Sequence, residues 1–238
     1  MAAQAPAAYR GMFPPAVAVA EMRETGDLAA LLPAEAAYLG RAVPSRAREF
    51  AAGRQCARRA LQELGIDQFP VRVAADRQPI WPDSIVGSIT HTRGFCAAVV
   101  AQRKRILGIG IDTEAVVQPR AGLAARICVP AELDWVDSLP AAQRTAATLM
   151  IFSAKEAFYK CQYPLVGEWL DFNDVSIEAL AWRGDSQPEE PAGAAPGDFL
   201  VRAMRPIAAR HRAPMPVRGH YRFHEQFVSA GVLWPAPG

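Results

Sequence analysis

Two short segments carry acidic and basic side chains at spacings that suit metal-dependent phosphate chemistry. The first ends an apolar run with two carboxylates, Asp112 and Glu114, that are two residues apart. The second has a third carboxylate, Glu156, flanked by Lys155 and Lys160. Three carboxylates with adjacent lysines are groups that can hold a divalent metal ion against a phosphorylated substrate. The two segments together predict a metal-assisted phosphate site.

The geometry of the first segment depends on its being a β-strand. Residues two apart on a strand point to the same face, so Asp112 and Glu114 can reach one point in space if the strand extends that far. Their hard oxygen ligands suit Mg²⁺, with Mn²⁺ as a possible substitute. Taken alone the pattern is weak, because an ordinary acidic strand end that faces solvent has the same residues.

The second segment reads as a helix on which Glu156 and Lys160 share one face. A surface pair at this spacing would contribute only about 0.2–0.5 kcal/mol. The apolar residues around the pair, including Met150, Ile151 and Phe158, make the helix apolar almost all round, which predicts burial. Buried carboxylates and amines need partners, and a bound metal and a diphosphate would supply them.

Hydrophobic periodicity and turn residues predict the elements that position these segments. Residues 1–27 are expected to be irregular or extended, and residues 184–197 to form a surface loop. Two apolar runs, 95–101 and 106–111, are expected to pair as a β-hairpin that ends at Asp112. The remaining expected elements are a helix near residues 33–39, a helix over 45–64 capped by Ser45, helices over 130–138 and 140–161, the latter stopped before Pro164, a strand over 172–177, and a closing hairpin over 220–234 with its turn near Glu225.

Each half of the chain is expected to hold a helix followed by strands. This order predicts an α+β fold of two similar α/β halves, residues 1–115 and 116–238, with the active site in the cleft between them.

Composition excludes several classes of function. The net charge of +2 makes no case for a nucleic-acid or membrane-surface partner. We find no signal peptide and no run of apolar residues long enough to span a membrane. The cysteines form no C-x-x-C pair and lie in apolar surroundings, which favours buried, reduced thiols in a cytoplasmic protein. They are Cys56, Cys96, Cys128 and Cys161.

Histidines offer weaker candidates. His91 follows Ser88 and Thr90 in a short polar segment just before the expected hairpin, although a lone histidine is more often structural. His220 and His224 have H-x-x-x-H spacing, but they fall on a strand-like segment and so would not form a helical zinc pair.

The two segments resemble the 4′-phosphopantetheinyl transferases, in particular the larger monomeric group that serves siderophore, polyketide and nonribosomal peptide synthesis. The family pattern is G-[IV]-D-x-E followed by [FW]-[ST]-x-K-E-[AS]-x-x-K. This chain has Gly110-Ile111-Asp112-Thr113-Glu114 and Phe152-Ser153-Ala154-Lys155-Glu156-Ala157-Phe158-Tyr159-Lys160. Upstream segments also look like the enterobactin-type branch: residues 48–58, 79–82 and 87–91.

This resemblance implies a fold of two halves about a pseudo-twofold axis, with coenzyme A in the cleft. The implied activity is transfer of the phosphopantetheine arm from coenzyme A, the co-substrate, to a serine of an apo acyl or peptidyl carrier protein. Adenosine 3′,5′-bisphosphate would be released. The expected protein is a cytoplasmic monomer whose partners are carrier domains and coenzyme A.

The resemblance also implies roles for individual residues. Asp112, Glu114 and Glu156 would hold Mg²⁺ against the coenzyme A diphosphate. Glu156 would act as the general base, Lys160 would stabilise or protonate the leaving phosphate, and Lys155 would grip a coenzyme A phosphate. The remaining coenzyme contacts would be His91 at the 3′-phosphate, Thr90 beside it, and the guanidinium groups of Arg46, Arg54 and Arg77. The family often has a basic residue directly before the proline at position 79, where this chain has Gln78.

Two other classes of function remain open. A Mg²⁺-dependent phosphohydrolase or nucleotidyl transferase could use the same carboxylates, although the chain has no G-x-x-x-x-G-K-[ST] loop. A non-catalytic module that binds coenzyme A or docks a carrier is the third hypothesis. It suits the carboxylates less, because without a metal they repel a diphosphate.

Overall fold

The computed structural model describes residues 7–40, 42–180, 182, 196–207 and 215–236. Within these residues the strands form two antiparallel sheets, one ordered β1-β3-β2 and one ordered β4-β8-β7-β6-β5. The strands are β1 (Val17–Met22), β2 (Ile85–Thr92), β3 (Phe95–Gln102), β4 (Ile106–Ala115), β5 (Val175–Ala179), β6 (Gly197–Ala203), β7 (Val217–His224) and β8 (Phe227–Pro235).

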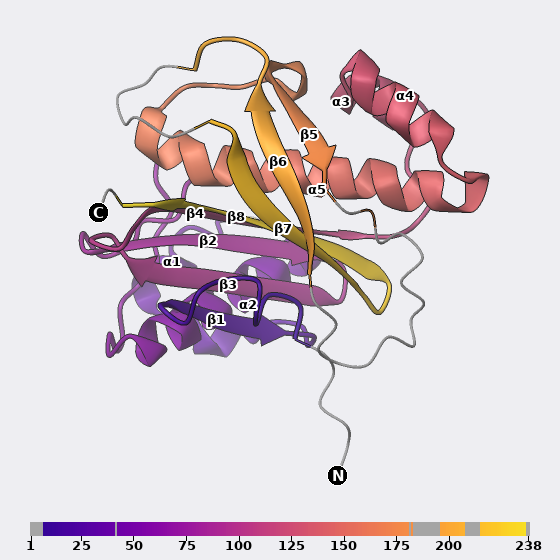
Figure 1. The fold of residues 1–238 in the computed structure, drawn as a ribbon. Coiled ribbons are helices and arrows are strands. Elements are labelled where there is room, and N and C mark those ends of the chain that lie inside the picture. Colours follow the sequence, from indigo (N-terminus) through magenta and orange to yellow (C-terminus); the bar gives the residue numbers. More distant parts are fainter. Residues whose placement is uncertain (1–6, 41, 181, 183–195, 208–214, 237–238) are drawn as a thin grey trace.

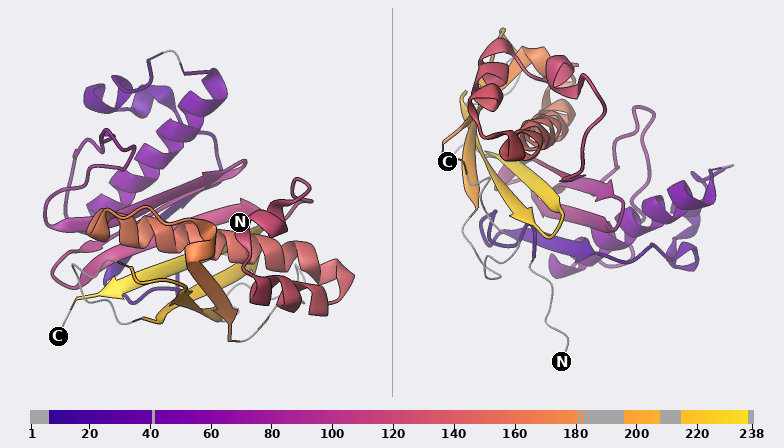
Figure 2. Two further views of the ribbon diagram at one scale, coloured as in Figure 1. Left: turned by 90° about the horizontal axis from the view of Figure 1, so that it is seen from above. Right: turned by 90° about the vertical axis from the view of Figure 1, so that its right-hand side faces the viewer.

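Two long helices enclose the sheets. The helix α2 (Pro44–Glu63) packs on β1 and β3, and α5 (Ala141–Val166) packs on β4 and β8. The strands β2, β3 and β4 lie between the two helices, whereas β5 and β6 cross in front of α5 in Figure 1 and lie on its side away from α2 in Figure 2. The shorter helical elements are η1 (Leu28–Ala30), α1 (Pro33–Ala36), α3 (Leu123–Ile127), α4 (Pro130–Ser138) and η2 (Phe172–Asp174).

Apolar side chains fill three layers. One core lies between α2 and the three-stranded sheet, and another between α5 and the five-stranded sheet. A third joins the inner face of β3 to Ile109 and Ile111 of β4. Antiparallel sheets covered by helices confirm the predicted α+β class. The division into halves at residues 115 and 116 stays a prediction.

The predicted hairpin of residues 95–101 and 106–111 is wrong. Both runs are strands, but β3 pairs with β1 and β2, whereas β4 pairs with β8. Because β3 already has a neighbour on each edge, the chain crosses to the other sheet after the turn in which Arg105 N donates to Gln102 O. β3 instead forms a hairpin with β2, which precedes it in the chain.

Two helix boundaries also differ from expectation. Pro44 occupies the first turn of α2, so Ser45 lies inside the helix. The N-cap is Val43, whose apolar side chain makes no hydrogen bond to the backbone. Helix α5 continues through Pro164 and ends at Gly167, whose φ of +69° suits glycine.

The strand expected over 172–177 begins only at Val175, after the 3₁₀ helix η2, whereas several other expectations are confirmed. Helix α4 has the predicted bounds, and β7 and β8 form the closing hairpin around Glu225. The four cysteines are buried and free. The expected loop over 184–197 lies almost wholly outside the described residues. The N-terminal segment, expected to be irregular or extended, contributes the edge strand β1. None of the helices in the described part of the chain has the length and apolarity to cross a membrane.

Candidate active site

Two glycines bring β4 unusually close to α5. A Cβ atom at Gly110 would lie 1.9 Å from the Ala157 carbonyl oxygen, and one at Gly108 would lie 2.6 Å from the Cys161 carbonyl oxygen. Only glycine allows this approach. Asp112 is the next residue on the same face of the strand, so its side chain meets α5 at close range.

Asp112 is the central acidic group of the site. Its Oδ1 atom accepts a hydrogen bond from Lys160 Nζ at 2.6 Å, and Lys160 Nζ also lies 3.3 Å from the Ile111 carbonyl oxygen. The other carboxylate oxygen, Oδ2, is buried without a hydrogen-bond partner among the described residues. An orphaned, buried carboxylate oxygen is costly unless a ligand completes it.

Glu114 and Glu156 face the same charges. Burial, reinforced by Asp112 and Glu156, raises the pKa of Glu114 to about 7, against the opposing effect of Lys160. Burial and the Asp112 carboxylate also raise the pKa of Glu156. Glu114 and Glu156 thus lie within electrostatic range of Asp112 and Lys160, which are themselves in direct contact.

Three carboxylates and one ammonium group leave an excess of negative charge that a divalent cation would neutralise. Among the described residues, no group of three or more acidic, histidine or cysteine side chains has the geometry of a formed metal site. Lys160 instead supplies the counter-charge to Asp112. The residues nevertheless fit a hard cation, because they offer oxygen ligands and one of these, Asp112 Oδ2, has no other partner.

Hydroxyl groups on β2 tie the two sheets together beside this cluster. The backbone N–H of Ile111 donates to Ser88 Oγ at 3.1 Å, and that of Thr113 donates to Thr90 Oγ1 at 3.0 Å. The Thr90 hydroxyl also lies 3.4 Å from Asp112 Oδ1. Thr90 is buried, so its side chain holds β4 in place and does not face a coenzyme.

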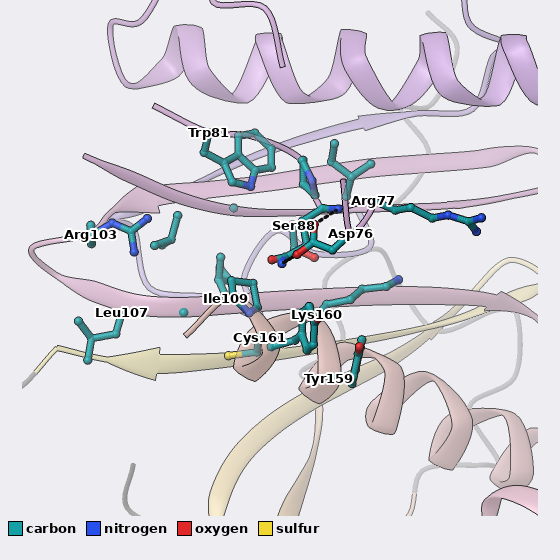
Figure 3. A pocket seen from close by; sticks show the side chains of 18 of the residues that line it. Asp76, Arg77, Trp81, Ser88, Arg103, Leu107, Ile109, Tyr159, Lys160 and Cys161 are labelled. Atoms are coloured by element: carbon teal, nitrogen blue, oxygen red, sulfur yellow. Dashed lines mark hydrogen bonds between the residues drawn. The ribbon is translucent and has the colours of Figure 1, made fainter. Parts of the chain in front are cut away.

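A cavity of about 540 Å³ opens between β2, β4 and α5. Figure 3 shows Lys160 and Arg77 toward one end of this cavity and Leu107 and Arg103 toward the other. Trp81 lies on its α2 side, opposite α5.

A second cavity, of about 380 Å³, adjoins the first and shares Arg77, Pro79 and Ile89 with it. Four of the predicted coenzyme contacts line this second cavity: Arg46, Arg54, Arg77 and His91. The sheet-to-sheet cavity and the arginine-lined cavity therefore form one extended surface that leads away from Lys160.

The basic groups of the second cavity are partly paired. Arg46 Nη1 donates to His91 Nε2 at 2.8 Å and also lies 3.1 Å from a Glu49 carboxylate oxygen. Burial and the Arg46 charge lower the pKa of His91. Arg54 Nε donates to the Val71 carbonyl oxygen, and its guanidinium lies 4.2 Å from the centre of the Phe50 ring. These contacts hold cationic groups around the cavity wall, where an anion would be attracted.

Comparison with known proteins identifies the family. Residues 34–101 match the model of the 4′-phosphopantetheinyl transferase N-terminal domain, and residues 108–191 match that of the 4′-phosphopantetheinyl transferase superfamily. The chain is 39% identical over 158 residues to the 4′-phosphopantetheinyl transferase PptT of Mycobacterium tuberculosis, covering 64% of this chain and 69% of PptT. The chain belongs to the 4′-phosphopantetheinyl transferases of the larger type.

Two further similarities differ in how much of the other protein they cover. The 4′-phosphopantetheinyl transferase Svp of Streptomyces mobaraensis is 40% identical over 148 residues, covering 62% of this chain and 60% of Svp. A solved holo-(acyl-carrier-protein) synthase from Bacillus anthracis, in complex with CoA (3′,5′-ADP), has a TM-score of 0.38 and 19% identity. It covers 56% of this chain and 99% of that structure.

The structure corrects the position expected for Lys155 in this transferase. Its ammonium group is buried and donates to the Ile127 carbonyl oxygen at 2.6 Å, to Glu132 Oε2 at 2.7 Å and to the Phe172 carbonyl oxygen at 2.8 Å. All three donor positions are therefore used inside the protein. Lys155 has no surface from which to grip a coenzyme A phosphate, and we remove it from the proposed ligands.

Sequence reasoning missed one buried contact within the transferase motif itself. The hydroxyl of Ser153 donates to the Asp112 carbonyl oxygen at 2.9 Å and so joins the two motifs directly. A small polar residue in an otherwise apolar helix was the available signal. Tyr159 and Tyr163, which stack on each other, add an aromatic wall to the first cavity that the motifs did not indicate.

Proposed function

We propose that this protein transfers the 4′-phosphopantetheine arm of coenzyme A to a serine hydroxyl of an apo carrier protein. The reaction requires Mg²⁺, or Mn²⁺ in its place, and releases adenosine 3′,5′-bisphosphate. The observation that carries this proposal is the unpartnered Asp112 Oδ2 atom, which lies in a cluster with Glu114, Glu156 and Lys160 beside an extended cavity with a basic wall.

The residues would divide the work by charge. Asp112, Glu114 and Glu156 would hold the metal ion, which when bound neutralises the diphosphate charge and orients the attacked phosphorus. The arginine-lined cavity would hold the 3′-phosphate, with Arg46 and Arg54 as fixed cations. The cavity between the sheets is the space available for the pantetheine arm.

Proton transfer follows from the same cluster. Glu156 would accept the proton of the carrier serine, directly or through a water, as the serine oxygen attacks phosphorus. The phosphorus–oxygen bond to the nucleotide then breaks. Lys160, which already bonds Asp112, would stabilise the charge on the departing phosphate.

The decisive experiment incubates the full chain with coenzyme A, Mg²⁺ and a panel of apo carrier proteins. We expect intact-mass spectrometry to show a phosphopantetheine addition on the carrier serine, and a carrier with that serine changed to alanine to show none. Phosphate or nucleotide release without a carrier would favour a phosphohydrolase instead. Coenzyme A binding with no product on any carrier would favour a binding module. The monomeric state, the cytoplasmic location and the apo acyl or peptidyl carrier domain as partner stay predictions.

A further inference from the structure

A row of buried polar side chains runs through the core behind β4. Tyr9 Oη lies 2.6 Å from Thr113 Oγ1, Thr113 Oγ1 lies 2.8 Å from Ser229 Oγ, and Ser229 Oγ lies 2.8 Å from His224 Nε2. At the other end, Tyr9 Oη donates to the Asp112 carbonyl oxygen at 2.6 Å. We call these four residues the hydroxyl chain. All four are buried, and Tyr9 has no exposed surface.

Counting protons gives the hydroxyl chain one direction. A hydroxyl has a single proton, and that of Tyr9 goes to the Asp112 carbonyl, so Thr113 must donate to Tyr9. The same reasoning makes Ser229 donate to Thr113 and requires His224 to donate from a protonated Nε2. Each donor therefore polarises the next, and all of them point toward the Asp112 carbonyl oxygen.

The histidine at the start of the chain supports this direction. Its other ring nitrogen, Nδ1, is buried with no hydrogen-bond partner in the described part of the protein. Burial lowers the pKa of His224 to about 4, so the ring is neutral at pH 7. A neutral ring with its proton on Nε2 leaves only a lone pair on Nδ1, which avoids stranding a buried N–H donor.

Tyr9 comes from an N-terminal segment that is itself firmly attached. The backbone N–H groups of Ala8 and Tyr9 donate to the Glu21 carboxylate at 3.0 and 2.7 Å. Arg222 Nη1 donates to the carbonyl oxygens of Ala7, Ala8 and Arg10. The Tyr9 ring lies against Phe13 and Phe95. This segment lies outside both stretches that match the family models.

The Asp112 main chain is thus held from two sides. Tyr9 donates to its carbonyl oxygen from the core that contains Ile109 and Ile111, and Ser153 donates to the same oxygen from α5. Alternation along β4 places the side chains of Ile109 and Ile111 on the face opposite to that of the Asp112 side chain. The Asp112 side chain, by contrast, has an oxygen with no partner.

We propose that Tyr9, with Thr113, Ser229 and His224 behind it, is a positioning residue that holds the Asp112 main chain so that its carboxylate is oriented for the divalent cation. The inference deepens the proposed function and rests on its assignment of Asp112 as a metal ligand. Residues that orient a metal ligand typically change metal affinity or activity about 10- to 100-fold when they are altered.

The test removes one hydroxyl at a time from the full chain and measures Mn²⁺ affinity by the electron paramagnetic resonance signal of free Mn²⁺. Thr113→Val keeps the side-chain shape but breaks the hydroxyl chain. Tyr9→Phe removes the hydroxyl that donates to the Asp112 carbonyl oxygen. We expect both to weaken Mn²⁺ binding about tenfold or more. Thr113→Ser restores a hydroxyl and should bind within about twofold of the original protein. Chemical denaturation of each variant shows that the protein measured is folded.

A matched control makes the same chemical change elsewhere. Thr148 is also buried, and its hydroxyl donates to the Arg144 carbonyl oxygen at 2.9 Å without touching the hydroxyl chain. Thr148→Val should leave Mn²⁺ affinity unchanged. If Thr113→Val and Tyr9→Phe bind Mn²⁺ as tightly as the original protein, the positioning role is wrong while the metal site stands. If the original protein binds no Mn²⁺, with or without coenzyme A, the metal assignment and this inference fail together.

Nitrogen-15 NMR of the histidine rings tests the direction of the hydroxyl chain without any metal. We expect His224 to be neutral at pH 7 with its proton on Nε2. A proton on Nδ1 would reverse the order of donors and overturn the chain as described.

Discussion

Two lysines of helix α5 form ion pairs with carboxylates of other elements, and the surroundings of the two pairs are opposite in character. In the first, Lys155 and Glu132 are only 1% and 3% exposed, and we call them the closed pair. In the second, Lys160 is 30% exposed and Asp112 retains an unbonded carboxylate oxygen, and we call them the open pair. The two lysines lie in one motif, yet only the second faces a cavity.

The difference separates a structural role from a functional one. Besides Lys155, Glu132 accepts hydrogen bonds from the backbone N–H groups of Val129 and Ile177. The closed pair therefore joins α4, α5 and β5, with every donor of Lys155 in use. The open pair has unfilled bonding capacity, which is what a ligand site needs.

The largest expected effect concerns Glu156, which follows Lys155 in sequence but interacts electrostatically with Asp112 and Lys160 of the open pair. Glu156→Gln removes the proposed base and should reduce phosphopantetheine transfer about 10²- to 10⁴-fold. Rates are measured by mass spectrometry of the carrier, and denaturant unfolding should show a folded protein. Near-normal turnover would contradict the assignment of Glu156.

Breaking the closed pair should affect stability. Lys155→Met leaves the Glu132 charge buried without its partner and should lower the free energy of unfolding by about 3–5 kcal/mol. The measurement is equilibrium denaturation in urea. Arg202→Met is the matched control, because Arg202 and Glu178 form an exposed pair and its loss should cost less than about 1 kcal/mol. Equal losses in the two variants would show that the closed pair has no special structural role.

The open pair should respond to metal. At a Mg²⁺ concentration about 100 times its dissociation constant, binding should stabilise the protein by about 2.7 kcal/mol. The measurement is the rise in melting temperature when Mg²⁺ is added to protein that a chelator has first freed of metal. Asp112→Asn should abolish this rise, whereas Arg202→Met should keep it. A rise of the same size in Asp112→Asn would place the ion elsewhere.

At neutral pH the smallest effect is that of His224, which appears only in acid and tests the polar groups behind the open pair. His224 has a folded-state pKa of about 4, below its unfolded value of about 6.5, so the unfolded chain binds more protons between these pH values. Its contribution to stability is therefore complete above pH 6.5 and is lost as pH falls toward 4, by at most about 1.4 kcal/mol per pH unit. Denaturation curves of His224→Gln should show a shallower decline over this range. An identical decline would refute the lowered pKa.

Much of the local structure could be predicted from the sequence. Helix α4, the closing hairpin and the buried face of α5 follow from periodicity and turn residues, which depend on near neighbours. The pairing of β3 and β4 could not be predicted in this way. Two adjacent apolar runs look like a hairpin, but β1, from a segment expected to be irregular or extended, takes the edge of β3 that β4 would have needed.

The candidate site shows the same division. The motifs predicted that Asp112, Glu114, Glu156 and Lys160 form one metal site. Lys160 bonds Asp112, and the charges of both affect the pKa values of Glu114 and Glu156, but binding of a metal by the three carboxylates stays a prediction. The contribution of Tyr9 gave no sequence signal, because it reaches Asp112 across more than a hundred positions of the chain. Lys155 misled for a related reason: its partner Glu132 lies on another helix.

The residue types and their spacing alone determined the family, the three carboxylates and the helix that carries one of them, because these depend on chemistry and on periodicity over a few residues. Only the tertiary structure decided which lysine faces the cavity, which sheet β4 joins and which hydroxyls hold Asp112. Those outcomes depend on the close approach of α5 to Gly108 and Gly110, and on which partners lie within reach of each buried polar group.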